Sequence, residues 1–318
     1  MNPYVFFVGC ARSGNTLVQR LADAHPELAV MHGTRWIARW HEKRIGVTAD
    51  GDITAELVER LPRHERFKAL EIEPEELTRV YRENQGVSYA AFVSALFDRF
   101  GKRRGKQLVG DKTPEYVKSI RTLHMLWPGA KFVHIIRDGR NVCLSVAEWR
   151  KGATRFPTWD DDPVATTAVW WDLNVRLARE AGRQLGPDLY YELRYEALVA
   201  DAAGECARMC AFLEIPYDDA MLRFHEGRTR SEPGLDAKKA WLPVTAGLRT
   251  WRSEMPPADI ARFEAAAGDL LDELGYTRGA ASLSENELER AARVRDAYAN
   301  RARARGRPLP EAWERRAA

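Results

Sequence analysis

The chain has 318 residues, of which 45% are hydrophobic and 30% are charged, a composition typical of folded proteins and too apolar for a disordered one. Its 49 basic and 46 acidic residues leave a formal net charge of +3. This balance is too even for a protein that binds nucleic acid over its whole surface, so we expect no nucleic-acid partner and only a local anion site.

The apolar segments are too short to cross a membrane. No stretch approaches the roughly 18 consecutive apolar residues that a membrane span needs, and the N-terminal run resembles a strand more than a signal peptide. The four cysteines, Cys10, Cys143, Cys206 and Cys210, form neither a CxxC pair nor a zinc-finger pattern. We therefore expect a cytoplasmic protein that has no membrane partner, no disulfide framework and no metal site.

Short β-prone runs alternate with amphipathic runs through residues 4–215. Strands are expected at residues 4–9, 28–31, 107–110, 131–136 and 189–193, and helices at residues 16–22, 114–127, 139–150 and 163–184. Residues 50–105 are expected to be a helical insertion on the acceptor side, and helices dominate after residue 195. The alternation predicts an α/β fold with a P-loop-like parallel sheet, flanking helices and a helical C-terminal part.

A glycine-containing turn, residues 9–16 (GCARSGNT), connects the first predicted strand to the first predicted helix. Its spacing is that of a Walker A loop, except that Asn15 replaces the lysine. Unpaired N–H groups and the helix dipole favour an anion at such a helix start. Because Arg12 is the only cation in the turn, we expect the turn to bind a terminal phosphate-like group without the usual Mg²⁺–triphosphate arrangement. The alternative is a strand–helix turn that binds nothing.

A second candidate anion site follows the predicted strand at residues 131–136. Arg137 comes at its carboxyl end, where open α/β sheets bind ligands, and Ser145 lies about two helical turns further on. A guanidinium group and a hydroxyl group suit a phosphate. The alternative is a surface ion pair between Arg137 and Asp138. Together, the two sites indicate a ligand that carries two separate phosphate groups.

These two motifs resemble those of the sulfotransferases that use 3′-phosphoadenosine 5′-phosphosulfate (PAPS). The turn is similar to the family's 5′-phosphosulfate loop in the Arg-Ser-Gly-x-Thr form, and the second motif is similar to its 3′-phosphate motif. Residues 21–27 and 111–145 are similar to tyrosylprotein sulfotransferases and their bacterial relatives, and weaker similarity extends to residue 277. The resemblance implies a sulfotransferase-like α/β domain at residues 1–279. We expect residues 280–318 to form a charged, solvated helical tail.

The resemblance also implies roles for individual residues. Contacts to PAPS, or to its product 3′-phosphoadenosine 5′-phosphate (PAP), are implied for Arg12, Ser13, Gly14, Asn15, Thr16, Arg137, Ser145, Tyr195, Thr245 and Arg249. Arg12 and Lys112 are implied to lie near the sulfuryl group as catalytic residues. The alternative for Lys112 is a surface lysine at the start of a helix.

The general base is where this chain departs from the family pattern. In the tyrosylprotein relatives a Glu serves as base, and without gaps its position falls on Gly33, which cannot accept a proton. His32 is the candidate substitute, because an imidazole with a pKa near 6.5 suits general-base work. A structural role for His32, and another acid such as Glu71 as base, remain the alternatives.

We therefore expect a PAPS-dependent sulfotransferase that acts on a hydroxyl group of a small metabolite or natural product. A P-loop kinase is one alternative, although Asn15 speaks against it. A nucleotide-binding protein with impaired catalysis is another, and Gly33 favours it. The sequence leaves the oligomeric state open. An apolar acceptor pocket has several candidate walls, although most of them are expected to be core residues: Trp36, Trp40, Trp149, Trp159, Trp170 and Trp171.

Overall fold

The computed structural model describes residues 4–149, 156, 158–226, 242–245, 247 and 249–317. In these residues five parallel strands form one sheet in the order β2-β3-β1-β4-β5. The strands are β1 (Val5–Gly9), β2 (Leu28–Met31), β3 (Leu108–Lys112), β4 (Lys131–Ile136) and β5 (Tyr190–Arg194). Their bounds lie within two residues of the predicted ones, and the predicted α/β fold with a helix-flanked parallel sheet is confirmed.

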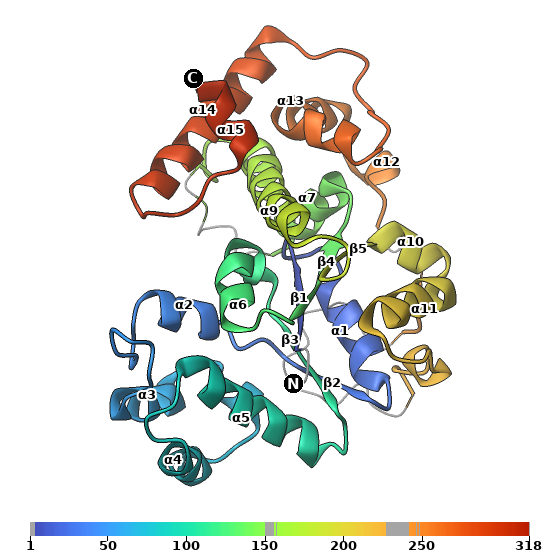
Figure 1. Cartoon of the computed structure of the whole chain (residues 1–318). Helices are drawn as coiled ribbons and strands as arrows, with labels where there is room; N and C mark the ends of the chain where they lie inside the picture. Colours follow the sequence, from blue (N-terminus) through green and yellow to red (C-terminus); the bar gives the residue numbers. More distant parts are fainter. Residues whose placement is uncertain are drawn as a thin grey trace.

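Both faces of the sheet are covered by helices, which explains the continuous apolar runs in its strands (Figure 1). Along β1, Val5 and Phe7 belong to one hydrophobic cluster, while Phe6 and Val8 belong to another on the opposite face. The first cluster is covered by α1 (Asn15–Ala24), α10 (Tyr195–Ala200) and α11 (Ala202–Leu213). The second is covered by α5 (Tyr89–Arg103), α6 (Ile120–Leu126) and α9 (Pro163–Leu185).

Residues 50–105 are largely helical, as predicted, and lie below the sheet at the lower left of Figure 1. With the preceding helix they comprise α2 (Ile37–Glu42), α3 (Ala55–Arg60), η1 (Leu61–Arg63), η2 (Phe67–Leu70), α4 (Pro74–Glu83) and α5. Their apolar faces continue the core from the sheet through Trp36, Leu57 and Phe92, all of which are fully buried. The insertion is therefore packed against the sheet as part of one core.

The prediction of one continuous helix at residues 114–127 is wrong, because the helix is interrupted. A 3₁₀ turn, η3 (Pro114–Lys118), ends at Ser119, whose φ of −131° is not helical, and α6 starts at the next residue. The Tyr116 hydroxyl explains the tight turn: it lies 2.8 Å from the Thr34 hydroxyl and accepts the Ile37 N–H at 3.2 Å. These contacts bind η3 to the segment that follows β2, which a local helical pattern cannot show.

A third cluster joins the C-terminal helices to α9, at the top of Figure 1. It involves α7 (Gly139–Ala147), α12 (Trp251–Glu254), α13 (Pro257–Glu273), α14 (Glu285–Arg303) and α15 (Glu311–Ala317). The short η4 (Asp219–Met221) lies outside this cluster and packs with α1. The expected solvated tail is therefore wrong for α14, where Val294 and Tyr298 are buried, and for Trp313, whose indole N–H donates to Asp172 Oδ1 at 2.6 Å. The apolar stripe of α14 has helical spacing and packs on α9. The division at residue 279 stays a prediction.

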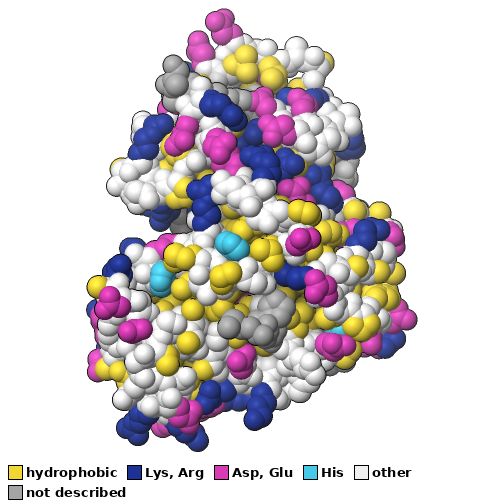
Figure 2. All heavy atoms as spheres, viewed as in Figure 1, with side chains coloured by type: hydrophobic (Ala, Val, Ile, Leu, Met, Phe, Trp, Pro, Cys, Tyr) yellow, Lys and Arg dark blue, Asp and Glu magenta, His cyan; other side chains and the backbone are white. Residues whose placement is uncertain are grey.

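The visible surface carries Lys, Arg, Asp and Glu side chains intermixed over its whole extent, in keeping with the even charge balance (Figure 2). Among the helices that the structure describes, none combines the length and the apolar character that a membrane crossing requires.

Candidate active site

The turn after β1 has the backbone conformation of an anion-binding loop. Arg12 and Gly14 adopt left-handed conformations with φ of 73° and 94°, and Gly14 directly precedes the first turn of α1. The Ser13 N–H and the Asn15 side-chain amide both donate to the Cys10 carbonyl, at 3.2 and 2.9 Å. Asn15, at the lysine position of a Walker loop, therefore stabilises the turn. The positive charge of the turn comes from Arg12.

Tyr195 presses directly on this turn. A Cβ atom at Gly14 would lie 2.4 Å from Cδ2 of the Tyr195 ring, so only glycine fits beneath it. The Ser13 hydroxyl is buried and has no hydrogen-bond partner within the described part of the chain. Buried hydroxyl groups are normally hydrogen-bonded, and a bound anion would provide the hydrogen-bond partner for this one.

Arg137 follows β4 and reaches the same place. Its Nη1 donates to the Arg12 carbonyl at 3.3 Å, although the two residues are 125 positions apart, and its guanidinium lies 4.3 Å from the Tyr195 ring centroid. Its Nε is buried without a partner among the described residues, and burial lowers its pKa. A cation in this position is stabilised by a bound anion.

Two further contacts join the two motifs. Arg12 Nε donates to the Ser145 hydroxyl at 2.9 Å, and the Arg12 guanidinium lies 6.0 Å from the Trp149 ring centroid. Arg249 pairs with Glu148 at 2.8 Å and is near enough to Arg137 to lower its pKa further by like-charge repulsion. Three guanidinium groups, from segments far apart in the sequence, therefore surround the ends of β1 and β4.

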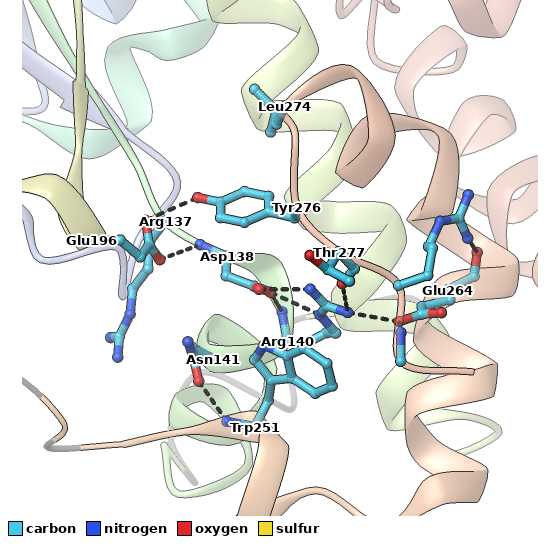
Figure 3. Close-up of polar contacts among 12 residues, drawn as sticks. Arg137, Asp138, Arg140, Asn141, Glu196, Trp251, Glu264, Leu274, Tyr276 and Thr277 are labelled. Carbon is cyan, nitrogen blue, oxygen red and sulfur yellow. Dashed lines mark hydrogen bonds and ion pairs between the residues drawn. The ribbon is translucent and has the colours of Figure 1, made fainter. Parts of the chain in front are cut away.

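A buried ion network holds the second motif in place (Figure 3). Arg140 is 1% exposed and bonds Asp138 Oδ2 at 2.8 Å and Glu264 Oε1 at 2.7 Å. Its guanidinium lies 3.6 Å from the Trp251 ring centroid, and the Trp251 N–H donates to Asn141 Oδ1 at 2.8 Å. The network fixes α12 and α13 against α7, and so positions Arg249 beside Glu148.

Glu196 connects the end of β5 to the same region (Figure 3). Its Oε1 accepts the Asp138 N–H at 2.9 Å, and its Oε2 accepts the Tyr276 hydroxyl hydrogen at 3.0 Å. Because Glu196 is adjacent to Tyr195, this pair of bonds anchors the segment that carries the Tyr195 ring.

Lys112 is the last residue of β3 and lies across from Phe7 of β1 in the sheet register. The residue as a whole is half-buried, and burial of its ammonium group lowers its pKa to about 8, although Asp111 and Glu115 oppose the shift. It is thus a partly desolvated cation at the carboxyl edge of the sheet, where its charge acts more strongly than in water.

The segment after β2 is shaped by Gly33. Its φ is 80°, and a Cβ atom there would lie 2.7 Å from the Lys112 carbonyl oxygen, so this backbone has no room for a glutamate. The neighbouring His32 is exposed. Asp111 is buried and accepts bonds from Thr34 and from Thr113, which gives it a structural role.

The alternative role of Glu71 as the base does not fit, because Glu71 lies at the other end of β3 from Lys112. Its carboxylate pairs with Arg104, four residues before that strand begins.

The comparisons with known proteins now decide the family. A family model described as "Sulfotransferase family" matches residues 3–219, more than half of the chain. The chain belongs to this sulfotransferase family. The predicted resemblance is confirmed, and so is the prediction of a sulfotransferase at the level of the family.

Curated sulfotransferases match over different shares of the chain. Protein-tyrosine sulfotransferase A of Caenorhabditis elegans is 26% identical over 86% of this chain and 67% of its own length. Omega-hydroxy-beta-dihydromenaquinone-9 sulfotransferase Stf3 of Mycobacterium tuberculosis is 31% identical over 55% of this chain and 43% of its own length. This sulfotransferase thus spans between 43% and 67% of the length of these two relatives.

Solved structures support the fold. The sulfotransferase domain of the Synechococcus PCC 7002 olefin synthase superposes with a TM-score of 0.59 at 24% identity, covering 87% of this chain and 95% of that domain. The sulfotransferase domain of the curacin biosynthetic pathway has the same TM-score at 15% identity, covering 88% of this chain and 99% of that domain. At these identities, the likeness concerns the fold alone.

The remaining candidates of this sulfotransferase fall into two groups. Trp36, Trp40 and Trp171 are buried core residues, as expected for most of the tryptophans, whereas Trp170 borders a cavity. The Thr245 hydroxyl donates to the Pro243 carbonyl at 2.7 Å, and a contact to PAPS stays a prediction for it.

Arg140 and Glu196 position the site but are not identifiable from local sequence patterns. The local signal for Arg140 was a charged residue within an apolar helix start, residues 139–147, but its acidic partner Glu264 lies 124 positions away. No local pattern could therefore identify the network.

Proposed function

We propose that this sulfotransferase moves the sulfuryl group of PAPS to a hydroxyl group of a small metabolite and releases PAP. The contact between the two anion-binding motifs carries the proposal: Arg137 reaches the Arg12 carbonyl at 3.3 Å, and Arg12 reaches Ser145 at 2.9 Å. Neighbouring sites of this kind suit one ligand that bears a phosphate group toward each end.

The residues present fit PAPS. On the turn after β1, the start of α1, the unpartnered Ser13 hydroxyl and Arg12 would hold the 5′-phosphosulfate. Arg137, Ser145 and Arg249 would hold the 3′-phosphate, which would satisfy the buried Arg137 Nε. When bound, PAPS supplies an activated sulfuryl group.

For the reaction, we assign Arg12 and Lys112 to stabilise negative charge. Transfer to the acceptor oxygen would break the bond from sulfur to the bridging phosphate oxygen, and Arg12 and Lys112 would stabilise the negative charge that this places on that oxygen and on the sulfuryl oxygens. Fixed cations at these positions lower the barrier. We assign His32 to accept the proton of the acceptor hydroxyl, because it adjoins Gly33, whose backbone lies against Lys112.

A small-molecule acceptor is supported by the Stf3 relative, whose name specifies an omega-hydroxy menaquinone derivative. Gly33, which leaves no room for a glutamate, separates this chain from the tyrosylprotein pattern. We also propose a cytoplasmic location, which the four free cysteines support.

The proposal is tested by nucleotide-dependent thermal stability and by transfer of radiolabelled sulfate. PAP is expected to raise the melting temperature without Mg²⁺, and a panel of phenols and alcohols is expected to yield a labelled product. Stabilisation by ATP with Mg²⁺ but not by PAP would favour a P-loop kinase instead. PAP binding without product from any acceptor would favour a nucleotide-binding protein with impaired catalysis.

A further inference from the structure

A cavity of about 170 Å³ lies between η3, α9 and the end of α14. It adjoins the turn after β1, because its lining residues Lys118 and Tyr298 both interact electrostatically with Cys10. Figure 2 shows a notch in the outline between the C-terminal helices and the lower part of the molecule, with Lys and Arg side chains beside it. The lining of the cavity includes Lys118, Trp170, Leu173, Leu177, Tyr298 and Arg301. None of the proposed PAPS contacts borders it.

The charged groups at this cavity are all basic. Lys118 comes from η3, and Arg301, Arg305 and Arg307 come from α14 and the turn after it. Glu115 acts on Lys118 from a distance, but this carboxylate already pairs with Arg35 at 3.2 Å.

The cations also act on one another. Burial lowers the pKa of Lys118, and the like charge of Arg307 lowers it further. Burial likewise lowers the pKa of Arg307, followed by repulsion from Arg305, Arg301 and Arg39. A group of cations that destabilise one another in this way is stabilised by an anion in the space between them.

The rest of the lining is apolar and has the size of one aromatic ring. Trp170, Leu173 and Leu177 form a wall on α9, and a cavity of about 150 Å³ is known to accommodate benzene. The Tyr298 hydroxyl is buried and has no hydrogen-bond partner among the described residues. The cavity therefore offers a cationic mouth, an apolar wall and one unused hydroxyl group.

We propose that this cavity binds an organic anion with a single aromatic ring or a short apolar chain. The ring or chain lies against Trp170 and Leu173, and the negatively charged group lies among Lys118, Arg301 and Arg305. Such a ligand can be the acceptor itself or a second molecule that does not react. Binding at this site does not depend on PAPS, and only the assignment of the acceptor as its ligand rests on the proposed function.

The test is isothermal titration calorimetry of the full chain with benzenesulfonate, and with benzyl alcohol as a neutral probe of similar size. We expect benzenesulfonate to bind, and the Arg301→Gln/Arg305→Gln variant to bind it at least about tenfold more weakly. Leu173→Trp, which fills the cavity, is expected to abolish binding. Arg293→Gln is the matched control, because Arg293 is an exposed arginine of α14 outside this cavity and pairs with Glu289.

The proposal is overturned if benzenesulfonate does not bind, if the Arg301→Gln/Arg305→Gln variant binds it as well as the unmodified chain, or if benzyl alcohol binds equally tightly. Circular dichroism melting shows whether the Leu173→Trp variant is folded, and the double arginine variant decides the matter if it is not. None of these measurements uses PAP, so their failure is distinct from failure of the proposed function.

A kinetic measurement separates the two sources of the ligand. If 4-hydroxybenzenesulfonate is sulfated and its KM rises at least about tenfold in the double arginine variant, the cavity holds the acceptor. If benzenesulfonate instead changes the turnover of a neutral phenol without competing with it, and the double variant removes this effect, the cavity holds a second ligand. If the double variant alters neither parameter, the anion bound in the calorimetry is a second molecule that takes no part in the transfer.

Discussion

The two halves of the sheet's carboxyl edge are built differently. At the ends of β1, β4 and β5, the candidate donor residues contact backbone carbonyls, each other and an aromatic ring, over the buried Arg140 network. At the ends of β2 and β3, His32 is exposed, and Arg35 pairs with two exposed carboxylates, Glu65 and Glu115. Exposed ion pairs contribute little to stability. The ends of β1, β4 and β5, called the donor side here, are therefore fixed before any ligand binds. The ends of β2 and β3, called the acceptor side, keep adjustable side chains.

Replacing Arg140 should break the donor side most severely. Arg140→Ala leaves Asp138 and Glu264 buried without their cation, which is expected to cost about 3–5 kcal/mol in the free energy of unfolding, measured in urea. Arg60→Ala removes an exposed pair with Glu56 and should cost less than about 1 kcal/mol. Equal losses in the two variants would contradict a rigid donor side.

Lys112 ends β3, next to β1 of the other half, and should affect turnover more than binding. Lys112→Met is expected to lower kcat about 100- to 1000-fold, because a fixed cation near the transferring group is lost, while PAP affinity changes little. Lys102→Met, at an exposed position on α5, should leave both unchanged. A variant at position 112 with full kcat would rule out its catalytic role.

The pH dependence of turnover tests whether the positive charge of Lys112 is needed. Because burial lowers its pKa to about 8, the cation is present below that pH and is lost as pH rises through it. We expect kcat to decline above about pH 8 in the unmodified enzyme, and this decline to move to higher pH in Lys112→Arg, since a guanidinium stays charged. An unchanged alkaline limb in the arginine variant would assign the decline to another group.

Arg137 should affect donor binding alone. Arg137→Ala is expected to weaken PAP binding about 10- to 100-fold, the loss of a charge-assisted bond to phosphate, with little change in kcat at saturating PAPS. Arg121→Ala, at an exposed residue of α6, serves as the control. Unchanged PAP affinity after Arg137→Ala would remove the 3′-phosphate site from the proposal.

The smallest expected effect tests the acceptor side. Gly33→Ala combines a left-handed φ of 80° with a clash against the Lys112 carbonyl, whereas Gly86→Ala has a similar φ of 73° and nothing within 4 Å. Gly33→Ala should therefore cost about 1 kcal/mol or more beyond Gly86→Ala in the free energy of unfolding. Equal costs would show that the close approach to Lys112 imposes no constraint.

The same division explains what the sequence could predict. The sheet and the two anion-binding motifs follow from local patterns, because each is a β-prone run followed by a helix start with Gly and Arg. The partner of Arg140, the break at Ser119 and the burial of α14 depend on contacts between distant segments. Gly33 was recognised as unusual from the sequence, but its contact with the Lys112 carbonyl required the structure.

The contact between Gly14 and Tyr195 has an evolutionary consequence. A methyl group at position 14 would overlap the ring at position 195, so neither residue can change freely while the other is kept. Relatives that carry alanine or serine at the first position are expected to carry a smaller, non-aromatic residue at the second. Such paired replacement, found in an alignment, would reveal that these two positions have diverged together.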